Sequence, residues 1–169
     1  MERRRLRKDK KEWFRFLDHR NGREGGGNVD DWRSTRGVNH LTATRVLVVD
    51  DFAPFREFVS LTLAERPELV VIGEASDGPE ALEKAVGLRP DLILLDLNLP
   101  KMNGMEVARR FRELVPESRI IFFSQESSVD LVEEARRMGV WGYVVKAEAR
   151  SQLLPTVYAV MSGKQSFGS

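Results

Sequence analysis

The sequence predicts an α/β protein built on a doubly wound, five-stranded parallel sheet. Between residues 45 and 163, short apolar runs alternate five times with apolar residues at helical spacing. The runs are apolar at consecutive positions, which is typical of parallel strands buried on both faces. Strict alternation of strand and helix predicts a sheet that helices cover on both sides.

The five predicted strands cover residues 46–49, 69–72, 92–95, 120–123 and 142–145. After each strand, apolar residues recur every three or four positions, as the buried face of a helix requires. These helical patterns cover residues 55–63, 81–86, 107–114, 131–138 and 154–161. We find no internal sequence repeat beyond this alternation.

Prolines and glycines predict where the helices begin and end. The segment Asp77–Glu80 reads Asp-Gly-Pro-Glu, a helix-start signal with proline suited to the first turn. Pro67, Pro116 and Gly139 end the first, third and fourth helices. In the last helix, Pro155 is expected to be tolerable only near the first turn. The apolar pattern of that helix consists of Leu154, Val157, Tyr158 and Met161.

Length and composition indicate a globular domain. The chain has 169 residues, 41% of them hydrophobic and 31% charged, which is enough for one domain with a core. It contains no cysteine, which excludes disulfides and cysteine-ligated metals and is compatible with a reducing cytoplasm. No apolar run approaches 18 residues, and the N-terminus lacks the apolar core of a signal peptide, so we expect no membrane segment.

Residues 1–40 differ from the rest and predict a basic, flexible N-terminal extension. They carry 12 Lys and Arg against 7 Asp and Glu, whereas the remainder has a net charge of −4. Three consecutive glycines, residues 25–27, are typical of a flexible linker. Alternative hypotheses are a non-specific nucleic-acid contact and a short partner-binding helix, although no nucleic-acid recognition motif is present. The helix would contain Trp13, Phe14, Phe16 and Leu17.

Polar residues close four of the five predicted strands. Asp50 and Asp51 follow the first strand, Asp96 the third, Ser124 the fourth and Lys146 the fifth. In a doubly wound sheet these positions share one edge, near the switch point where ligands bind. Three carboxylates repel each other unless a cation is present, and oxygen ligands suit Mg²⁺. With a hydroxyl and an ammonium added, the set suits a phosphoryl group, and an aspartate can be its nucleophile.

Four segments carry a resemblance to a known family: VLVVDD (46–51), LILLDLNLPKMNG (92–104), FFS (122–124) and GYVVK (142–146). The chain from about Thr44 to Gly163 closely resembles the receiver domain of two-component response regulators, which has the CheY-like form of the flavodoxin-like fold. The predicted domain organisation therefore has three parts: an extension at 1–40, a receiver domain at 41–165 and a C-terminal tail at 166–169.

The resemblance also implies a role for each polar residue. Asp96 would be the phosphoacceptor and a metal ligand. Asp51 would bind Mg²⁺ directly, Asp50 would bind it through water, and the backbone carbonyl of Asn98 would be a further ligand. The phosphoryl group would receive a hydrogen bond from Ser124 and pair with Lys146. The switch residues would be Ser124 and Tyr143, the latter at the aromatic switch position.

A two-state signalling function follows from the resemblance. A histidine kinase, a phosphotransfer protein or a small phosphodonor would phosphorylate Asp96. Ser124 would then be drawn inward and Tyr143 would turn inward. The surface of the fourth helix, fifth strand and fifth helix would change its partner preference, and could form a homodimer. The protein would be a cytoplasmic phosphoprotein and not an enzyme, with at most autophosphorylation and autodephosphorylation activity.

Departures from the common receiver pattern favour a subgroup. Many receivers have proline where this chain has Ala147, and a small residue where it has Gln125. Both features recur in receivers of LuxR/NarL-type regulators, and residues 163–167 resemble the start of their linker. Only 23 residues follow Lys146, too few for a DNA-binding domain. We therefore expect a stand-alone receiver or the receiver part of a LuxR-type transcriptional regulator. Because receivers begin shortly before their first strand, a native start near Leu41 is a further hypothesis.

Two rival functions fit the sequence less well. A phosphohydrolase of the haloacid-dehalogenase type also has an aspartate after an apolar strand, but it requires a second aspartate where this chain has Asn98. It also leaves Asp50 and Asp51 unexplained. A receiver fold that acts as an interaction module without phosphorylation is the second alternative, and the complete acidic set argues against it.

Overall fold

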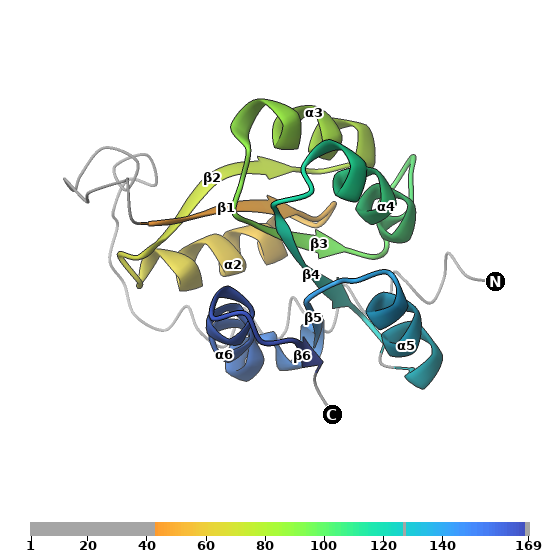
Figure 1. Cartoon of the computed structure of the whole chain (residues 1–169). Helices are drawn as coiled ribbons and strands as arrows, with labels where there is room; N and C mark the ends of the chain where they lie inside the picture. The colour runs from red at the N-terminus through yellow and green to blue at the C-terminus, as the bar shows by residue number, and fades with distance from the viewer. Residues whose placement is uncertain (1–42, 127, 168–169) are drawn as a thin grey trace. The chain divides into compact units, whose positions relative to one another are not determined.

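A parallel sheet of six strands forms the centre of the fold. In this computed structural model, which describes residues 43–126 and 128–167, the strands are β1 (Thr44–Val49), β2 (Leu69–Ala75), β3 (Leu92–Asp96), β4 (Arg119–Ser124), β5 (Gly142–Val145) and β6 (Ser166–Phe167). Their order is β2-β1-β3-β4-β5-β6, and every neighbouring pair is parallel (Figure 1). The predicted doubly wound α/β fold is confirmed. The expectations about residues 1–40 lie outside the described residues.

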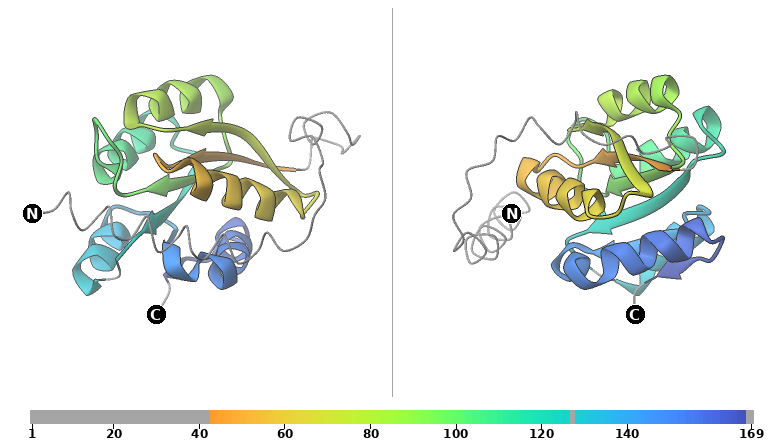
Figure 2. Two further views of the ribbon diagram at one scale, coloured as in Figure 1. Left: turned by 180° about the vertical axis from the view of Figure 1, so that it is seen from behind. Right: turned by 90° about the vertical axis from the view of Figure 1, so that its left-hand side faces the viewer.

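Five α-helices connect the strands: α2 (Ala53–Ala64), α3 (Gly78–Leu88), α4 (Gly104–Leu114), α5 (Val129–Arg137) and α6 (Ala149–Met161). A 3₁₀ turn, η2 (Lys146–Glu148), precedes α6. Helices α3, α4 and α5 cover one face of the sheet, and α2 and α6 cover the other (Figures 1 and 2). No helix within the described ranges combines the length and the apolar character that a membrane span needs.

The two faces of the sheet follow from the twofold alternation of strand side chains. Leu47 and Val49 of β1 belong to the core cluster under α3, α4 and α5, together with Phe111 and Phe122. The alternate residues are buried as well: Val46 and Val48 of β1 are at most 1% exposed. Central strands buried on both faces explain why the sequence shows unbroken apolar runs rather than alternation.

Local signals fix the beginnings and ends of the helices. Helix α3 begins where predicted, because the N-cap Asp77 accepts a hydrogen bond from the Glu80 amide at 2.9 Å. Asn103 caps α4 in the same way, and Ser128 caps α5. Gly139 follows α5 with a φ of 73°, a left-handed conformation that glycine adopts without strain.

Two expectations about the last helix were wrong. Pro155 lies in the middle of α6 rather than in its first turn. It is exposed, and packing of the buried Leu153 and Val157 keeps the helix on the sheet despite the lost intrahelical hydrogen bond. Tyr158 was expected on the apolar face but is 41% exposed.

The C-terminal residues form an additional strand that the sequence did not predict. Ser166 and Phe167 pair with Gly142 and Tyr143 of β5. The Ser166 amide donates to the Trp141 carbonyl at 2.9 Å, and the Arg136 guanidinium lies 4.4 Å from the Phe167 ring centroid. Regular structure therefore continues beyond residue 165, where the receiver domain was expected to end.

Phe111 tests how strongly α4 depends on the core. Its side chain is fully buried, whereas Leu114 on the same helix is 47% exposed. We expect Phe111→Ala to lower the free energy of unfolding by about 3–5 kcal/mol, since the change leaves a cavity. Leu114→Ala is the matched control and should change it by less than about 1 kcal/mol. Urea unfolding followed by circular dichroism measures both, and equal effects would contradict the assignment of the core face.

Candidate functional site

The carboxyl ends of β1, β3 and β5 bring one cation and two anions together in a buried site. Asp50 follows β1, Asp96 ends β3, and Lys146 follows β5. The Lys146 Nζ lies 2.6 Å from Asp50 Oδ2 and 2.9 Å from Asp96 Oδ2. All three residues are at most 2% exposed. Strand polarity produces this convergence, because parallel strands carry their carboxyl ends to one edge.

Asp51 adds a third carboxylate on the solvent side. Oxygen atoms of Asp50, Asp51 and Asp96 all lie within 4.8 Å of one another, and Asp51 is the exposed member of the group. Hard divalent cations with oxygen ligands, Mg²⁺ in particular, fit such a donor set. The prediction from the sequence that these three carboxylates lie close together is confirmed.

The lysine is the counter-ion of the buried pair. Burial lowers the pKa of Lys146, but the nearby Asp96 and Asp50 carboxylates outweigh it, and the pKa lies above its ordinary value. Burial, together with repulsion by Asp96, raises the pKa of Asp50 to about 6, because these two effects exceed the attraction of Lys146. The Lys146 ammonium also lies 4.8 Å from the Phe55 ring centroid, so an aromatic ring of α2 covers it.

Backbone amides orient the two buried carboxylates. The Phe52 amide donates to Asp50 Oδ1 at 2.8 Å, and the Asn98 amide donates to Asp96 Oδ1 at 3.1 Å. Each carboxylate is thus held by an amide on one oxygen and by Lys146 on the other. Gly104 permits the tight turn after β3, because a Cβ there would lie 2.3 Å from the Asp96 carbonyl oxygen.

Ser124 and Tyr143 form a second polar pair beside the carboxylates. Ser124, at the end of β4, is 3% exposed, and its Oγ accepts a hydrogen bond from the Glu126 amide at 3.2 Å. Tyr143 is 1% exposed and its hydroxyl donates to the Glu126 carbonyl at 2.7 Å. Burial raises the Tyr143 pKa, although a hydrogen bond with Ser124 acts in the opposite direction. Tyr143 already points inward here, so the expected inward turn requires a different starting conformation.

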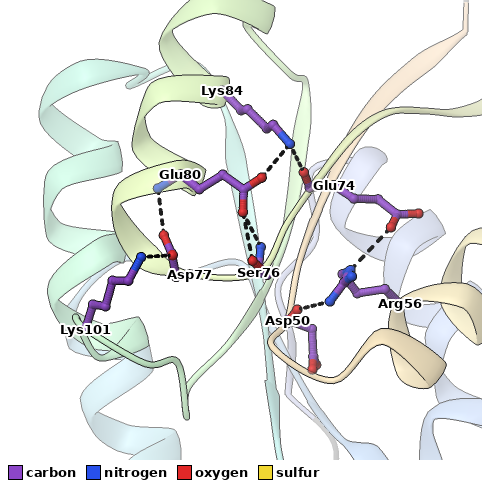
Figure 3. A network of polar contacts seen from close by, with 8 residues as sticks. All are labelled: Asp50, Arg56, Glu74, Ser76, Asp77, Glu80, Lys84 and Lys101. Atoms are coloured by element: carbon purple, nitrogen blue, oxygen red, sulfur yellow. Dashed lines mark hydrogen bonds and ion pairs between the residues drawn. The ribbon is translucent and has the colours of Figure 1, made fainter.

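A polar network links the site to the neighbouring loops (Figure 3). Arg56 of α2 donates to the Asp50 carbonyl and pairs with Glu74 of β2. Lys84 joins Glu74 to Glu80 by donating to the Glu74 carbonyl at 2.5 Å and to Glu80 Oε1 at 2.7 Å. The remaining members continue the network: Glu80 accepts from Ser76, and Asp77 pairs with Lys101 of the loop between β3 and α4.

Sequence reasoning missed Phe55, Arg56 and Glu74. Phe55 was interpreted only as part of a helical core face. A charged residue inside the otherwise apolar segment of β2 was the available signal for Glu74. Nothing in the sequence pattern distinguished Arg56 from other surface arginines, because its partners lie 6 and 18 positions away.

A doubly wound sheet whose carboxyl edge carries three aspartates, a lysine and a hydroxyl is the architecture of a receiver, the phosphoacceptor module of two-component signalling. A family model described as "Response regulator receiver domain" matches residues 46–158. The chain belongs to this family, and it is a phosphoacceptor rather than a catalytic enzyme.

Sequence comparison shows that this receiver domain is similar to those of NarL/LuxR-family regulators. The nitrate/nitrite response regulator protein NarL of Escherichia coli strain K12 is 37% identical over 119 residues, which make up 70% of this chain and 55% of NarL. A putative transcriptional regulator of Pseudomonas aeruginosa is 35% identical over 120 residues, 71% of this chain and 58% of that protein. The chain spans about half the length of these curated relatives.

Solved structures agree with this placement. The receiver domain of the putative response regulator NarL from Mycobacterium tuberculosis has a TM-score of 0.67 and 34% identity, covering 72% of this chain and 98% of that one. A LuxR-family two-component response regulator from Aurantimonas sp. SI85-9A1 has a TM-score of 0.70 and 29% identity, covering 73% and 89%.

Removing Lys146 should expose the electrostatic cost of the buried aspartates. We expect Lys146→Met to lower the free energy of unfolding by about 3–5 kcal/mol at pH 8 in EDTA, because two buried carboxylates lose their shared cation. Lys164→Met replaces an exposed lysine and should cost less than about 0.5 kcal/mol. Urea denaturation measures both variants. A wild-type midpoint for Lys146→Met would mean that another group neutralises the pair.

Glu80 should make stability depend on pH in acid. Hydrogen bonds from Lys84 and from the Ser76 amide lower its pKa from 4.5 to about 2. A depressed carboxyl pKa stabilises the fold above pH 4.5, and this contribution disappears as the pH falls towards 2. We expect Glu80→Gln to make the melting temperature depend less on pH between pH 4.5 and about 2. Glu83→Gln, an exposed glutamate on the same helix, should keep the wild-type profile.

Proposed function

We propose that Asp96 is the residue that accepts the phosphoryl group. The supporting observation is the environment of its carboxylate. Oδ2 lies 2.9 Å from Lys146 Nζ, Oδ1 receives the Asn98 amide, and the carboxylates of Asp50 and Asp51 lie within 4.8 Å. Among these carboxylates, only Asp96 lies on the central strand β3 between β1 and β4, next to both the acidic pair and Ser124.

The chemistry is one displacement at phosphorus. A carboxylate oxygen of Asp96 attacks the phosphorus of a phosphohistidine or a small acyl phosphate, the new O–P bond forms, and the bond from phosphorus to the leaving group breaks. The leaving group departs with the electron pair of that bond, as a carboxylate from an acyl phosphate or as an imidazole that takes its proton from solvent. Lys146 is already beside Asp96 Oδ2, where its ammonium offsets charge on the phosphoryl oxygens.

The carboxylates of Asp50, Asp51 and Asp96, with the backbone carbonyl of Asn98, would hold Mg²⁺. Bound Mg²⁺ would supply charge neutralisation for the phosphoryl oxygens. The three-carboxylate donor set supports this assignment, because two of its members are buried with a single lysine for compensation. In this role Asp50 would act through water and Asp51 directly.

The change of the partner-binding surface on phosphorylation depends on Ser124 and Tyr143. In this proposal Ser124 donates to the phosphoryl group, and Tyr143 responds because both residues share the Glu126 backbone as a partner. The responding surface is α5, β5 and α6, the fourth helix, fifth strand and fifth helix of the earlier expectation. It would bind a partner or a second copy of this chain. The phosphodonor is a histidine kinase or phosphotransfer protein in the cytoplasm, and the relatives support a link to LuxR-type regulation.

Acetyl phosphate and Mg²⁺ test the proposed acceptor. We expect intact-mass spectrometry to detect one added phosphoryl group on the wild-type chain, and none on Asp96→Asn or in the presence of EDTA. Asp91→Asn is the matched control, since Asp91 is an exposed aspartate at the opposite end of β3. The Asp91→Asn chain should still gain one phosphoryl group.

Three results would overturn the assignment. An adduct on Asp96→Asn would move the acceptor to another residue. Failure of the wild type to form either a phosphoryl adduct or a beryllofluoride complex would favour an interaction module without phosphorylation. Release of phosphate from many small phosphoesters would instead favour a phosphohydrolase.

A further inference from the structure

Asp50 is held at each of its four polar groups. Its amide donates to the Ala75 carbonyl at 3.0 Å, and its carboxylate oxygens contact the Phe52 amide and Lys146. Its carbonyl accepts from Arg56 Nη1 at 2.7 Å. The first three contacts hold the side chain and the end of β1. The fourth is different, because it acts on the peptide group that leads into Asp51.

That peptide group determines where Asp51 lies. The peptide bond is planar, so a fixed Asp50 carbonyl also fixes the direction of the Asp51 amide and the position of its Cα. Asp51 is exposed and lies in the turn between β1 and α2, outside the regular strands and helices. The backbone that Arg56 holds is therefore one determinant of how the Asp51 carboxylate lies towards Asp96.

Arg56 is itself anchored by a second residue. Its Nε lies 3.3 Å from Glu74 Oε2, and the Arg56 side chain is only 18% exposed. Glu74 Oε1 accepts from the Ser60 hydroxyl at 2.8 Å, and the Glu74 carbonyl accepts from Lys84. Glu74 also lies on β2, opposite Val48 of β1. The guanidinium is thus fixed between the sheet and α2, with one edge aimed at the Asp50 carbonyl (Figure 3).

We propose that Arg56, oriented by Glu74, is a positioning residue for the divalent-cation site of Asp50 and Asp51. This inference rests on the Mg²⁺ binding proposed above. It assigns Arg56 no contact with the ion or the phosphoryl group. Arg56 acts through the peptide between the two aspartates, as outer residues do around metal ligands.

The sign of the effect separates positioning from simple electrostatics. Arg56 is a cation near three carboxylates, so its charge opposes Mg²⁺ binding, and removing only that charge would tighten binding. Removing a positioning contact would weaken binding, because the backbone that carries the Asp51 carboxylate would lose one of its fixed points. Arg56→Ala and Arg56→Lys separate the two effects, since lysine keeps the charge but cannot contact Glu74 and the Asp50 carbonyl as a fork.

The experiment is calorimetric titration of Mg²⁺ into the full chain. We expect Arg56→Ala to raise the Kd by about 10-fold, Arg56→Lys to raise it by less, and Glu74→Gln to lie between Arg56→Lys and the wild type. Arg110→Ala removes an exposed ion pair on α4 and should leave the Kd unchanged. Melting curves in EDTA, recorded in parallel, confirm that each variant is folded at the titration temperature.

Each outcome has one interpretation. A wild-type or lower Kd for both Arg56 variants would overturn the positioning role while leaving Mg²⁺ binding intact. Absence of Mg²⁺ binding by the wild type would overturn the metal site of the proposed function itself. If Arg56→Ala does not fold, Arg56→Lys and Glu74→Gln decide the question, because a purely structural role would lower their melting temperatures without raising the Kd.

Discussion

The ammonium of Lys146, shared between the buried carboxylates of Asp50 and Asp96, is the interaction on which the site depends. A carboxylate without a partner is very costly to bury, and here two lie at the ends of neighbouring strands. The lysine that follows β5 offsets this cost, because it brings a cation to the same point. The fold and its chemistry are thus linked, because the parallel topology that builds the core also determines which charges meet.

Much of this arrangement follows from the sequence. Consecutive apolar residues identified the buried strands, and the polar residues that close four of them could be assigned to one edge without knowing any distance. Asp50, Asp51, Asp96 and Lys146 were found this way because their positions depend on strand polarity alone. The inward orientation of Tyr143 could not be predicted, since it depends on a hydrogen bond to the Glu126 carbonyl.

The remaining differences also have physical causes. A two-residue strand such as β6 is too short to produce a periodic pattern, so it was interpreted as part of a tail. Propensity excluded Pro155 from the interior of α6, but tertiary packing overrode propensity. Residues such as Arg56 act through partners that are distant in sequence, and a single sequence carries no signal for such pairs.

The polar network around Asp50 shows how loops next to a core can be fixed without apolar burial. The loops after β1, β2 and β3 each contribute a residue to it: Asp50, Asp77 and Lys101. Most of its contacts are with backbone carbonyls or with charged partners, which are the stronger class of hydrogen bond. A network of this kind can hold loops rigid while leaving their outer side chains exposed to a ligand.

The two edges of the sheet have a consequence for association between copies of the chain. A long, regular edge strand can pair with an identical strand and lead to aggregation. At one edge, β2 pairs with β1 through an irregular register between Val46 and Leu47, and it carries the charged Glu74. At the other, β6 ends the sheet with only two residues. Within the described residues, the irregular register and charge of β2 and the shortness of β6 therefore disfavour self-association by sheet extension.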